Sequence, residues 1–419
     1  MEKKKWSAFF GSLCIILIFA MLLLMVGWIR PAITYAASDK VPDKIRFGCA
    51  IALSGMNAMP ADGMQVSVWK LWAEDTNAKG GILVPKYNKR IPVELVLYDD
   101  HSDIETSVKM FEKLILQDNV DFMLPPWGTA FILAAAPIAA KYQYPLIANT
   151  ISMATLQEKL AHLPYLFVVL NQPPGVVKGT LDLMKELDMK SVAIFYVADQ
   201  FGLEHWATIA PLIGMTDIKV PIFKAIPLGA PDLSILIKKT MSAKVDGVIS
   251  FGYPDSTILW TKQMMALGYN PKFFFNGALT NTMDYRDMFG AAVVEGVIGM
   301  DAYNPKMAPP AGKKFYESYK KKWGKECNRG TEVFAYAALQ FIEQAVEKVG
   351  DFDRPKIRDV IAKDTFNTVV GPMSFVDQYS TNLQADVGQW QKGEFEAIMS
   401  KDKRTVKVEY PKPKWPSSK

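Results

Sequence analysis

Residues 45–53 read IRFGCAIAL, a mostly apolar run that ends at a turn signal. A run of this kind is typical of a strand in a parallel sheet, because helices cover both faces of such a sheet and bury both faces of the strand. The apolar residues that follow recur at helical spacing and comprise Met64, Val68, Leu71 and Trp72. Gly80 and Gly81 predict the end of that helix. The stretch therefore predicts a strand followed by a helix.

The alternation of strand and helix continues along the chain. Further strands are predicted at VELVLYDD (93–100), VDFMLPP (120–126) and YPLIA (144–148). The pattern restarts with KSVAIFYVADQFG (190–202), VDGVISFGYPD (245–255) and PKFFFNGALTN (271–281). Strands that alternate with helices predict an α/β fold with parallel sheets covered on both faces. A chain of 419 residues is long for one core, so we expect two domains.

The N-terminal segment differs from the rest of the chain. Three lysines at 3–5 precede an apolar run over 13–29, and RPAITYAASDK (30–40) follows. A basic start, an apolar middle and a small-residue exit predict a secretory signal over residues 1–36, with a mature start near Ala37. An uncleaved membrane anchor is the alternative, because the apolar run approaches the length that spans a bilayer. We expect a periplasmic or extracellular protein after cleavage, and a membrane-anchored one if the segment is retained.

The charge balance does not indicate a nucleic-acid partner. Without residues 1–36 the chain keeps 44 basic and 42 acidic side chains, and Lys and Arg are scattered along it. Half of all residues are hydrophobic and 22% are charged, which is a globular composition. Two cysteines remain, Cys49 in a predicted buried strand and Cys327 in a predicted charged helix. Two unpaired thiols are the simpler interpretation of this pair.

Sequence motifs of common enzyme classes are absent. The chain has no G-x-G-x-x-G after its first strand, no G-x-x-x-x-G-K-[ST], no G-x-S-x-G and no H-E-x-x-H. Its histidines, His101, His162 and His205, are far apart and lack metal-ligand spacing. The acids at 99–103 could suggest a metal site, but a loop with a helix cap explains them better. We therefore predict no catalytic residue, no metal and no cofactor.

The residues at the predicted strand ends indicate binding instead. Ligands of open α/β sheets lie outside the carboxyl ends of the strands. Small hydroxyl residues and glycines there expose backbone N–H groups, and aromatic rings offer flat apolar walls, which suits an organic solute with an anionic or polar head. The predicted ligand-binding residues are Trp127, Gly128, Thr129, Asn149, Thr150, Ser152, Phe201, Tyr253 and Asn276.

The stretch PPWGTAFILAAAPIAAKYQYPLIANTIS (125–152) holds most of these residues. Thr129 is a suitable N-cap for a helix that begins at Ala130, and Gly128 lets a ligand approach the backbone. The N–H groups at that helix end carry partial positive charge and could hold a carboxylate without an arginine. The alternative is that Thr129 only caps its helix and Trp127 only fills the core.

With these features, the chain resembles the periplasmic solute-binding proteins of branched-chain-amino-acid-type ABC transporters. The resemblance covers residues 45–399 and includes IALSGMNAMPADGM (51–64), AEDTNAKGGI (73–82), YPLIANTIS (144–152) and VVEGVIG (293–299). It implies two doubly wound parallel-sheet lobes joined by three hinge crossings, which close on a small-molecule solute without a cofactor. It also implies delivery of the solute to the membrane permease of an ABC importer, and we expect a monomer.

The resemblance suggests boundaries for these parts. We expect one lobe to comprise 43–170 and 301–372, the other to comprise 171–300 and 373–410, and a loose tail to follow over 411–419. A ligand sensor of the same fold, as in cytoplasmic amide-sensing relatives, is the alternative function. The N-terminal signal argues against that alternative.

The resemblance also assigns roles to single residues. It places the first-lobe hydroxyl on Thr129, a small polar loop on Thr150 and Ser152, and pocket aromatics on Phe201 and Tyr253. The acid that holds the ligand ammonium in amino-acid binders is replaced by Asn276-Gly277. We therefore hypothesise a carboxylate or amide with an apolar or aromatic body and no essential α-amino group. Asp255 is the main threat to this hypothesis, because it is close to Tyr253 in sequence.

Overall fold

The computed structural model describes residues 40–416 of the chain. The segment predicted to be a secretory signal, residues 1–36, lies outside the described residues. Within 40–416, no helix combines the length and the apolar character that crossing a membrane requires.

A seven-stranded sheet forms the core of the middle part of the chain. Its strands run in the order β18-β17-β12-β11-β10-β8-β9. The five strands from β9 to β12 are parallel, and β17 and β18 add an antiparallel edge. The strands are β8 (Ser191–Val197), β9 (Lys219–Ile226), β10 (Gly247–Phe251), β11 (Phe273–Phe275), β12 (Ile298–Ala302), β17 (Ala385–Gln391) and β18 (Glu394–Met399).

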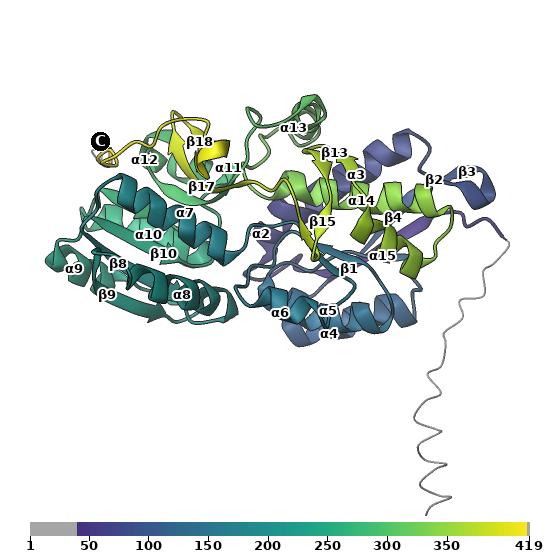
Figure 1. Ribbon diagram of the computed structural model, residues 1–419, viewed down its shortest axis with the longest axis horizontal. Coiled ribbons are helices and arrows are strands. Elements are labelled where there is room, and N and C mark those ends of the chain that lie inside the picture. The colour runs from purple at the N-terminus through teal and green to yellow at the C-terminus, as the bar shows by residue number, and fades with distance from the viewer. Residues whose placement is uncertain (1–39, 417–419) are drawn as a thin grey trace, which may run out of the picture. The chain divides into compact units, whose positions relative to one another are not determined.

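Helices cover both faces of this sheet, as the apolar strands predict. Val192 and Ile194 of β8 pack in one core with side chains of α7 and α8, whereas Ala193 and Phe195 pack in another core with α9 and α10. Successive side chains of a strand point to opposite faces, so β8 needs apolar residues at every position. Figure 1 shows these helices around β8, β9 and β10. They are α7 (Pro173–Glu186), α8 (Gln200–Ile213), α9 (Ser234–Ala243) and α10 (Pro254–Ala266).

A second group of strands comes mostly from the beginning of the chain, with two short strands from near its end. It contains a parallel sheet of order β4-β1-β5 and a sheet of order β15-β16-β7-β6. Its strands are β1 (Ile45–Ile51), β4 (Val93–Asp99), β5 (Phe122–Met123), β6 (Leu146–Ala148), β7 (Leu166–Val168), β15 (Phe375–Val376) and β16 (Tyr379–Ser380). Two hairpins accompany them, β2 (Ile82–Val84) with β3 (Lys89–Ile91) and β13 (Phe366–Thr368) with β14 (Gly371–Met373).

Helices also pack on both faces of this second group. Phe111 of α4 and Ile132 of α5 share a core with β6 and β7, whereas Phe47 of β1 packs edge-on against Trp72 of α3, with 5.1 Å between the ring centroids. Helix α14 lies against α3 and α15. The helices are α3 (Ser67–Ala78), α4 (Ile104–Leu116), α5 (Thr129–Lys141), α14 (Glu332–Val349) and α15 (Arg354–Lys363). The remaining elements are α2 (Ala58–Ala61), the π-helix η1 (Asp62–Val66), η2 (Pro85–Tyr87), α6 (Leu156–Leu160), α11 (Met283–Phe289), α12 (Ala291–Val294), α13 (Pro310–Trp323) and η3 (Lys401–Lys403).

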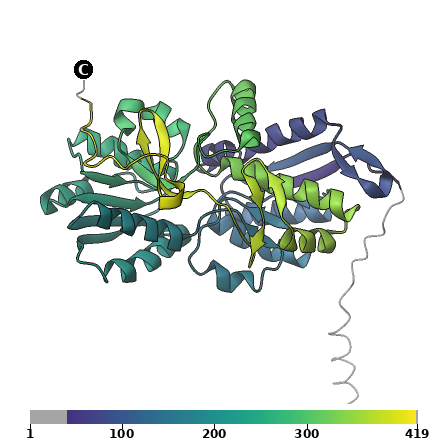
Figure 2. The ribbon, with the colours of Figure 1, turned by 45° about the horizontal axis from the view of Figure 1, so that its top comes forward.

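The chain passes between the two groups of strands three times. It does so between β7 and β8, after β12, and between β16 and β17. Figures 1 and 2 both show the last passage, where the C-terminal part of the chain continues from β15 to β17. We propose that the groups are the predicted lobes, with the first division at 170/171 and the second after Ala302, where β12 ends, rather than at 300/301. Because β16 pairs with β7, we propose that the third crossing lies between Ser380 and Ala385 rather than at 373.

Both cysteines of this part of the chain are buried and unpaired, which agrees with the sequence. Cys49 lies in β1, as predicted. The prediction of a helix around Cys327 is wrong, because this residue lies in the connection between α13 and α14. Helix α13 ends at Trp323, and Gly324 follows it in the left-handed conformation. A glycine in this conformation is a common helix stop.

The C-terminal tail was expected to be loose from residue 411, and this expectation is wrong for the described residues 411–416. The backbone N–H of Lys412 donates to the carbonyl of Lys272 over 2.7 Å. The indole Nε1 of Trp415 donates to the carbonyl of Tyr269 over 2.8 Å, and its ring packs against Phe274. The apolar ring of Trp415 provides burial that the Lys- and Pro-rich composition of the tail did not suggest.

Two groups of strands joined by three crossings predict hinge closure. We expect the radius of gyration of the purified protein in X-ray scattering to fall when a saturating solute is added, with pivots near residues 170 and 301 and at the third crossing. The control is a solute that does not change the melting temperature. An unchanged radius of gyration with a bound solute would contradict a trap that closes.

Candidate functional site

One cavity collects residues that follow strands of both groups. It encloses about 540 Å³ of space that protein atoms do not fill, part of it open to solvent. Eight of the nine predicted ligand-binding residues line it, and Asn276 does not. The lining residues are Met64, Trp127, Gly128, Thr129, Asn149, Thr150, Ser152, Leu170, Phe201, Tyr253, Ala278, Asn281, Met300, Asp301 and Thr331.

Thr129 joins two of the loops at this cavity. Its Oγ1 accepts a hydrogen bond from the backbone N–H of Ser152 over 3.1 Å, and it contacts the carbonyl of Ser152 at 3.3 Å. The prediction that Thr129 is an N-cap is wrong, because Gly128 occupies that position and Thr129 is the first residue of α5. Gly128 has φ 99°, a conformation that other residues rarely adopt, so the helix starts one residue earlier than predicted. The hydroxyl is thereby free to hold the loop after β6.

A second contact joins the same two loops. The backbone N–H of Gly128 donates to Oγ1 of Thr150 over 3.2 Å. Thr129 and Thr150 therefore place hydroxyl oxygens beside the first turn of α5, and Ser152 contacts Thr129 through its backbone. The first N–H groups of a helix have no acceptor within the helix and carry partial positive charge. This edge of the cavity is suited to a carboxylate or another polar head.

Three aromatic side chains form a wall of the cavity. Trp127 follows β5, whereas Phe201 belongs to α8 and Tyr253 precedes α10. The ring centroids of Trp127 and Tyr253 lie 5.8 Å apart, and Phe201 stacks on Tyr253 at 5.2 Å. Burial and the neighbouring carboxylate of Asp199 raise the pKa of Tyr253 well above its ordinary value, so this residue is a neutral phenol. The wall offers flat apolar surface from both groups of strands.

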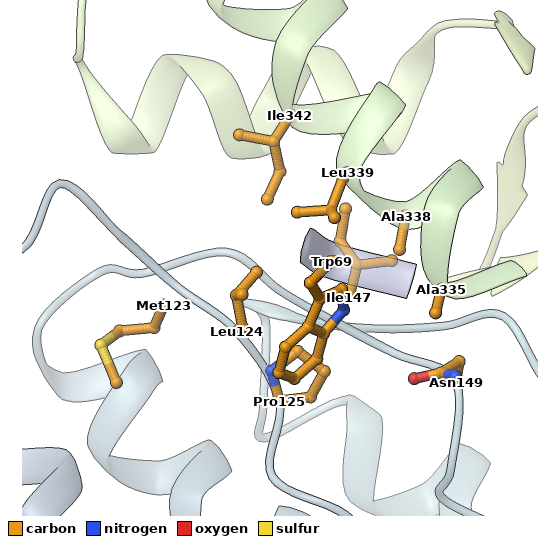
Figure 3. A pocket seen from close by; sticks show the side chains of 10 residues that line it. All are labelled: Trp69, Met123, Leu124, Pro125, Ile147, Asn149, Ala335, Ala338, Leu339 and Ile342. Carbon is orange, nitrogen blue, oxygen red and sulfur yellow. The ribbon is translucent and has the colours of Figure 1, made fainter. Parts of the chain in front are cut away.

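Asn149 lies between this cavity and a smaller one behind it. Figure 3 shows the smaller cavity, where Trp69 and Leu124 face apolar side chains of α14. Among the residues that line this smaller cavity, only Asn149 carries an amide, a hydroxyl or a charged group. The Oδ1 of Asn149 accepts from Nε2 of Gln65 over 3.1 Å, and its Nδ2 donates to the carbonyl of Met64 over 3.4 Å. These contacts hold the loop after β6 against η1, and we interpret the smaller cavity as packing space.

Asn276 is buried away from the cavity. Its Nδ2 donates to the carbonyl of Thr257 over 3.0 Å and to Oγ1 of Thr261 over 3.3 Å. The adjacent Gly277 lies so close to Gly252 that an added Cβ would be 2.2 Å from the carbonyl oxygen of Gly252. The Asn-Gly pair thus allows the ends of β10 and β11 to approach each other. The sequence pattern at this strand end reflects packing.

Sequence reasoning missed an acid that lines the cavity. Asp301, in β12, is 6% exposed, and among residues 40–416 its Oδ1 has no hydrogen-bond partner. Burial, with a smaller contribution from Asp386, raises the pKa of Asp301 well above its usual range. Asp255, in contrast, is exposed in the first turn of α10 and does not line the cavity. The premise that the cavity lacks an acid is therefore wrong. The hypothesis that the solute has no essential α-amino group loses its basis, because it rested on that premise.

A signal for Asp301 was present in the sequence. This residue follows the apolar run over 297–300, where the rule for strand ends applies as it does at Trp127. In the sequence, Asp301 stands at the predicted boundary between the lobes at 300/301. Residues at such a boundary also border the space between the lobes. The other missed lining residues are Met64, Leu170, Ala278, Asn281, Met300 and Thr331.

Within the described part of the chain, no group of three or more His, Cys, Asp or Glu side chains is placed to hold a metal ion.

The family model described as "Periplasmic binding protein" matches residues 44–394. The chain belongs to this family. The match confirms the resemblance found in the sequence, and this is a family of binding proteins, not of enzymes.

Individual relatives agree with this assignment. A "Leucine-, isoleucine-, valine-, threonine-, and alanine-binding protein" of Pseudomonas aeruginosa is 24% identical over 362 residues, which is 85% of this chain and 93% of the relative. The substrate-binding protein LivJ of Streptococcus pneumoniae, solved with isoleucine, has a TM-score of 0.73 at 19% identity, over 84% of this chain and 98% of that chain. A solute-binding protein of R. palustris, solved with benzoate, has a TM-score of 0.72 at 16% identity, over 88% and 97%. The likeness confirms the predicted α/β fold with two lobes.

We expect the hydroxyl of Thr129 to contribute to binding. Thr129→Ala should weaken solute binding by roughly 1–3 kcal/mol, because a buried polar partner is lost. It should also lower the free energy of unfolding by about 1 kcal/mol, since the N–H of Ser152 loses its acceptor. Thr129→Ser keeps the oxygen and should keep both properties. Calorimetry and thermal melts check these values, and equal affinity in all three proteins would make Thr129 purely structural.

The buried carboxyl of Glu332, beside Thr331, predicts a pH dependence of stability. Glu332 is fully buried at the start of α14, and burial raises its pKa from 4.5 to about 7. Between these two values the folded state binds a proton that the unfolded state releases, so stability is greatest below about 4.5 and falls as the pH rises through about 7. We expect Glu332→Gln to remove a decline of up to roughly 3 kcal/mol over this range. Denaturant unfolding of both proteins from pH 4.5 to 8 measures the difference, and parallel curves would contradict it.

Proposed function

We propose that this protein is an extracytoplasmic solute-binding receptor of an ABC importer. It captures a small organic solute between its two lobes and delivers the solute to a membrane permease. The observation that carries the proposal is the aromatic wall, because Trp127 from one group of strands meets Tyr253 and Phe201 from the other at a single cavity. A wall with rings from both lobes is complete only when the lobes approach, which couples binding to closure.

The two kinds of lining surface support a class of solute. Hydroxyl groups of Thr129, Thr150 and Ser152, with the first turn of α5, suit a carboxylate or amide head. The rings of Trp127 and Tyr253 suit an apolar or flat body. The solute class is therefore a carboxylate, an amide or an amino-acid-like molecule. The isoleucine and benzoate in two structural relatives both have a carboxylate and an apolar body.

Placement outside the cytoplasm follows from the family, and export by residues 1–36 is our proposal. We also propose that the receptor is a monomer, because delivery of one solute to a permease needs only one pair of lobes. Fractionation of cells that express the full chain tests the location. Recovery in the cytoplasm would favour the ligand sensor of the same fold instead.

A thermal-shift screen followed by calorimetry tests the binding proposal. The screen contains aliphatic and aromatic carboxylates, their amides, and amino acids. We expect at least one class to raise the melting temperature, because a ligand that binds only the folded state at 100 times its Kd adds about 2.7 kcal/mol of stability. Tyr253→Ala should abolish the shift by removing the ring that contacts both Trp127 and Phe201. No shift with any solute in the screen would contradict the proposal.

A further inference from the structure

Two buried polar atoms at the cavity lack a partner. Asp301 and Thr331 are each 6% exposed, and both line the cavity. The Oδ1 of Asp301 and the Oγ1 of Thr331 have no hydrogen-bond partner within residues 40–416. A buried polar atom costs free energy unless a partner satisfies it, and a buried carboxylate costs most. Because both residues line the cavity, a solute inside it is the candidate partner.

Hydrogen bonds hold the two segments together. The Nδ2 of Asn281 donates to the carbonyl of Asp301 over 3.0 Å, and the N–H of Arg329 donates to the carbonyl of Asn281 over 3.0 Å. The N–H of Tyr303 donates in turn to the carbonyl of Arg329 over 2.8 Å. Asn281 itself lines the cavity. Hydrogen bonds thus hold the segments around 301 and 331 together as one edge of the cavity. This edge is separate in sequence from Thr129, Thr150 and Ser152.

The charges around this edge are mainly acidic. Besides burial, the carboxyl groups of Asp386 and Glu332 disfavour the ionisation of Asp301, whereas the side chains of Gln384 and Asn171 favour it through hydrogen bonds. The neighbouring guanidinium of Arg329 is engaged elsewhere, because it pairs with Glu394 over 3.0 Å and with Glu326 over 3.3 Å. A second anionic group of a solute would be repelled here. A hydrogen-bond donor, above all a cationic one, would be attracted.

From these contacts we infer that the solute carries a second polar group, an N–H or O–H donor, which binds the carboxyl of Asp301 and the hydroxyl of Thr331. The inference rests on the proposed function and extends it to the chemistry of the solute. An ammonium group and a neutral hydroxyl or amide share the required donor. The acidic surroundings favour the ammonium group. The side-chain amides of Gln384 and Asn171 act on the carboxyl of Asp301 and are the competing donors from within the protein.

Matched pairs of solutes test the inference by calorimetry on the purified protein at pH 7.5. Phenylalanine is compared with 3-phenylpropionate and leucine with 4-methylpentanoate, which differ by the ammonium group. Comparison of 4-hydroxybenzoate with benzoate tests a neutral donor. We expect the donor-bearing member of at least one pair to bind at least tenfold more tightly. A preference in the first two pairs identifies an ammonium group, and one in the third alone identifies a neutral donor.

Variants then test the residues. Asp301→Asn should reduce the preference for the donor-bearing solute at least tenfold, and Thr331→Val should reduce it to a smaller extent. Asp287→Asn is the matched control, because it removes an exposed carboxylate of the same lobe that does not line the cavity, and it should keep the preference. Asp301→Asn should also raise the melting temperature of the free protein, since it replaces a carboxyl whose ionisation is opposed by burial with an uncharged amide. Thr331→Val preserves the test if Asp301→Asn does not fold.

The possible failures are distinguishable. Equal affinity for both members of every pair would overturn this inference and leave the proposed function intact. An unchanged preference in Asp301→Asn would also overturn it, as expected if Gln384 satisfies the carboxyl. Absence of binding by every solute would contradict the proposed function and remove this inference with it.

Discussion

The covering of both sheet faces by helices is the constraint on which the rest of this structure depends. Val192 and Ile194 of β8 face one layer of helices, and Ala193 and Phe195 face the other, so neither face of the sheet can receive a solute. Polar groups and open space are left at the strand ends. The glycines there serve this arrangement, since Gly128 turns the chain into α5 and Gly277 lets two strand ends approach.

The same constraint divides the site between two groups of strands. Hydroxyl groups lie beside the start of α5, whereas most of the aromatic wall belongs to α8 and the start of α10. The contact between Trp127 and Tyr253 joins residues that are far apart in sequence. A solute that fills the cavity therefore contacts both lobes, and its binding free energy can drive their closure.

The carboxamide of Asn276 and the carboxyl of Asp301 show how the surroundings of a side chain determine its role. Asn276 follows an apolar strand, but its amide bonds inward to α10 and serves packing. Asp301 belongs to the next strand of the sheet and lines the cavity, and its Oδ1 has no hydrogen-bond partner among the described residues 40–416. Both residues follow apolar runs that predict strands, so the sequence alone does not distinguish their roles. Only their surroundings separate a structural amide from a carboxyl that is available to a solute.

The sequence by itself determined the alternation of strands and helices, the α/β fold and the loops that border the cavity, because the periodicity of apolar side chains and the turn residues are local properties. It also identified Trp127, Gly128, Thr129 and Tyr253 as neighbours of one cavity through the rule for strand ends. The tertiary structure alone decided that Thr129 bonds to Ser152 instead of capping α5, that the tail packs through Trp415, and that Asp301 joins the cavity while Asn276 does not. These outcomes depend on contacts between distant segments, whose geometry is set by how helices and strand ends pack and is not encoded in any short stretch of the chain.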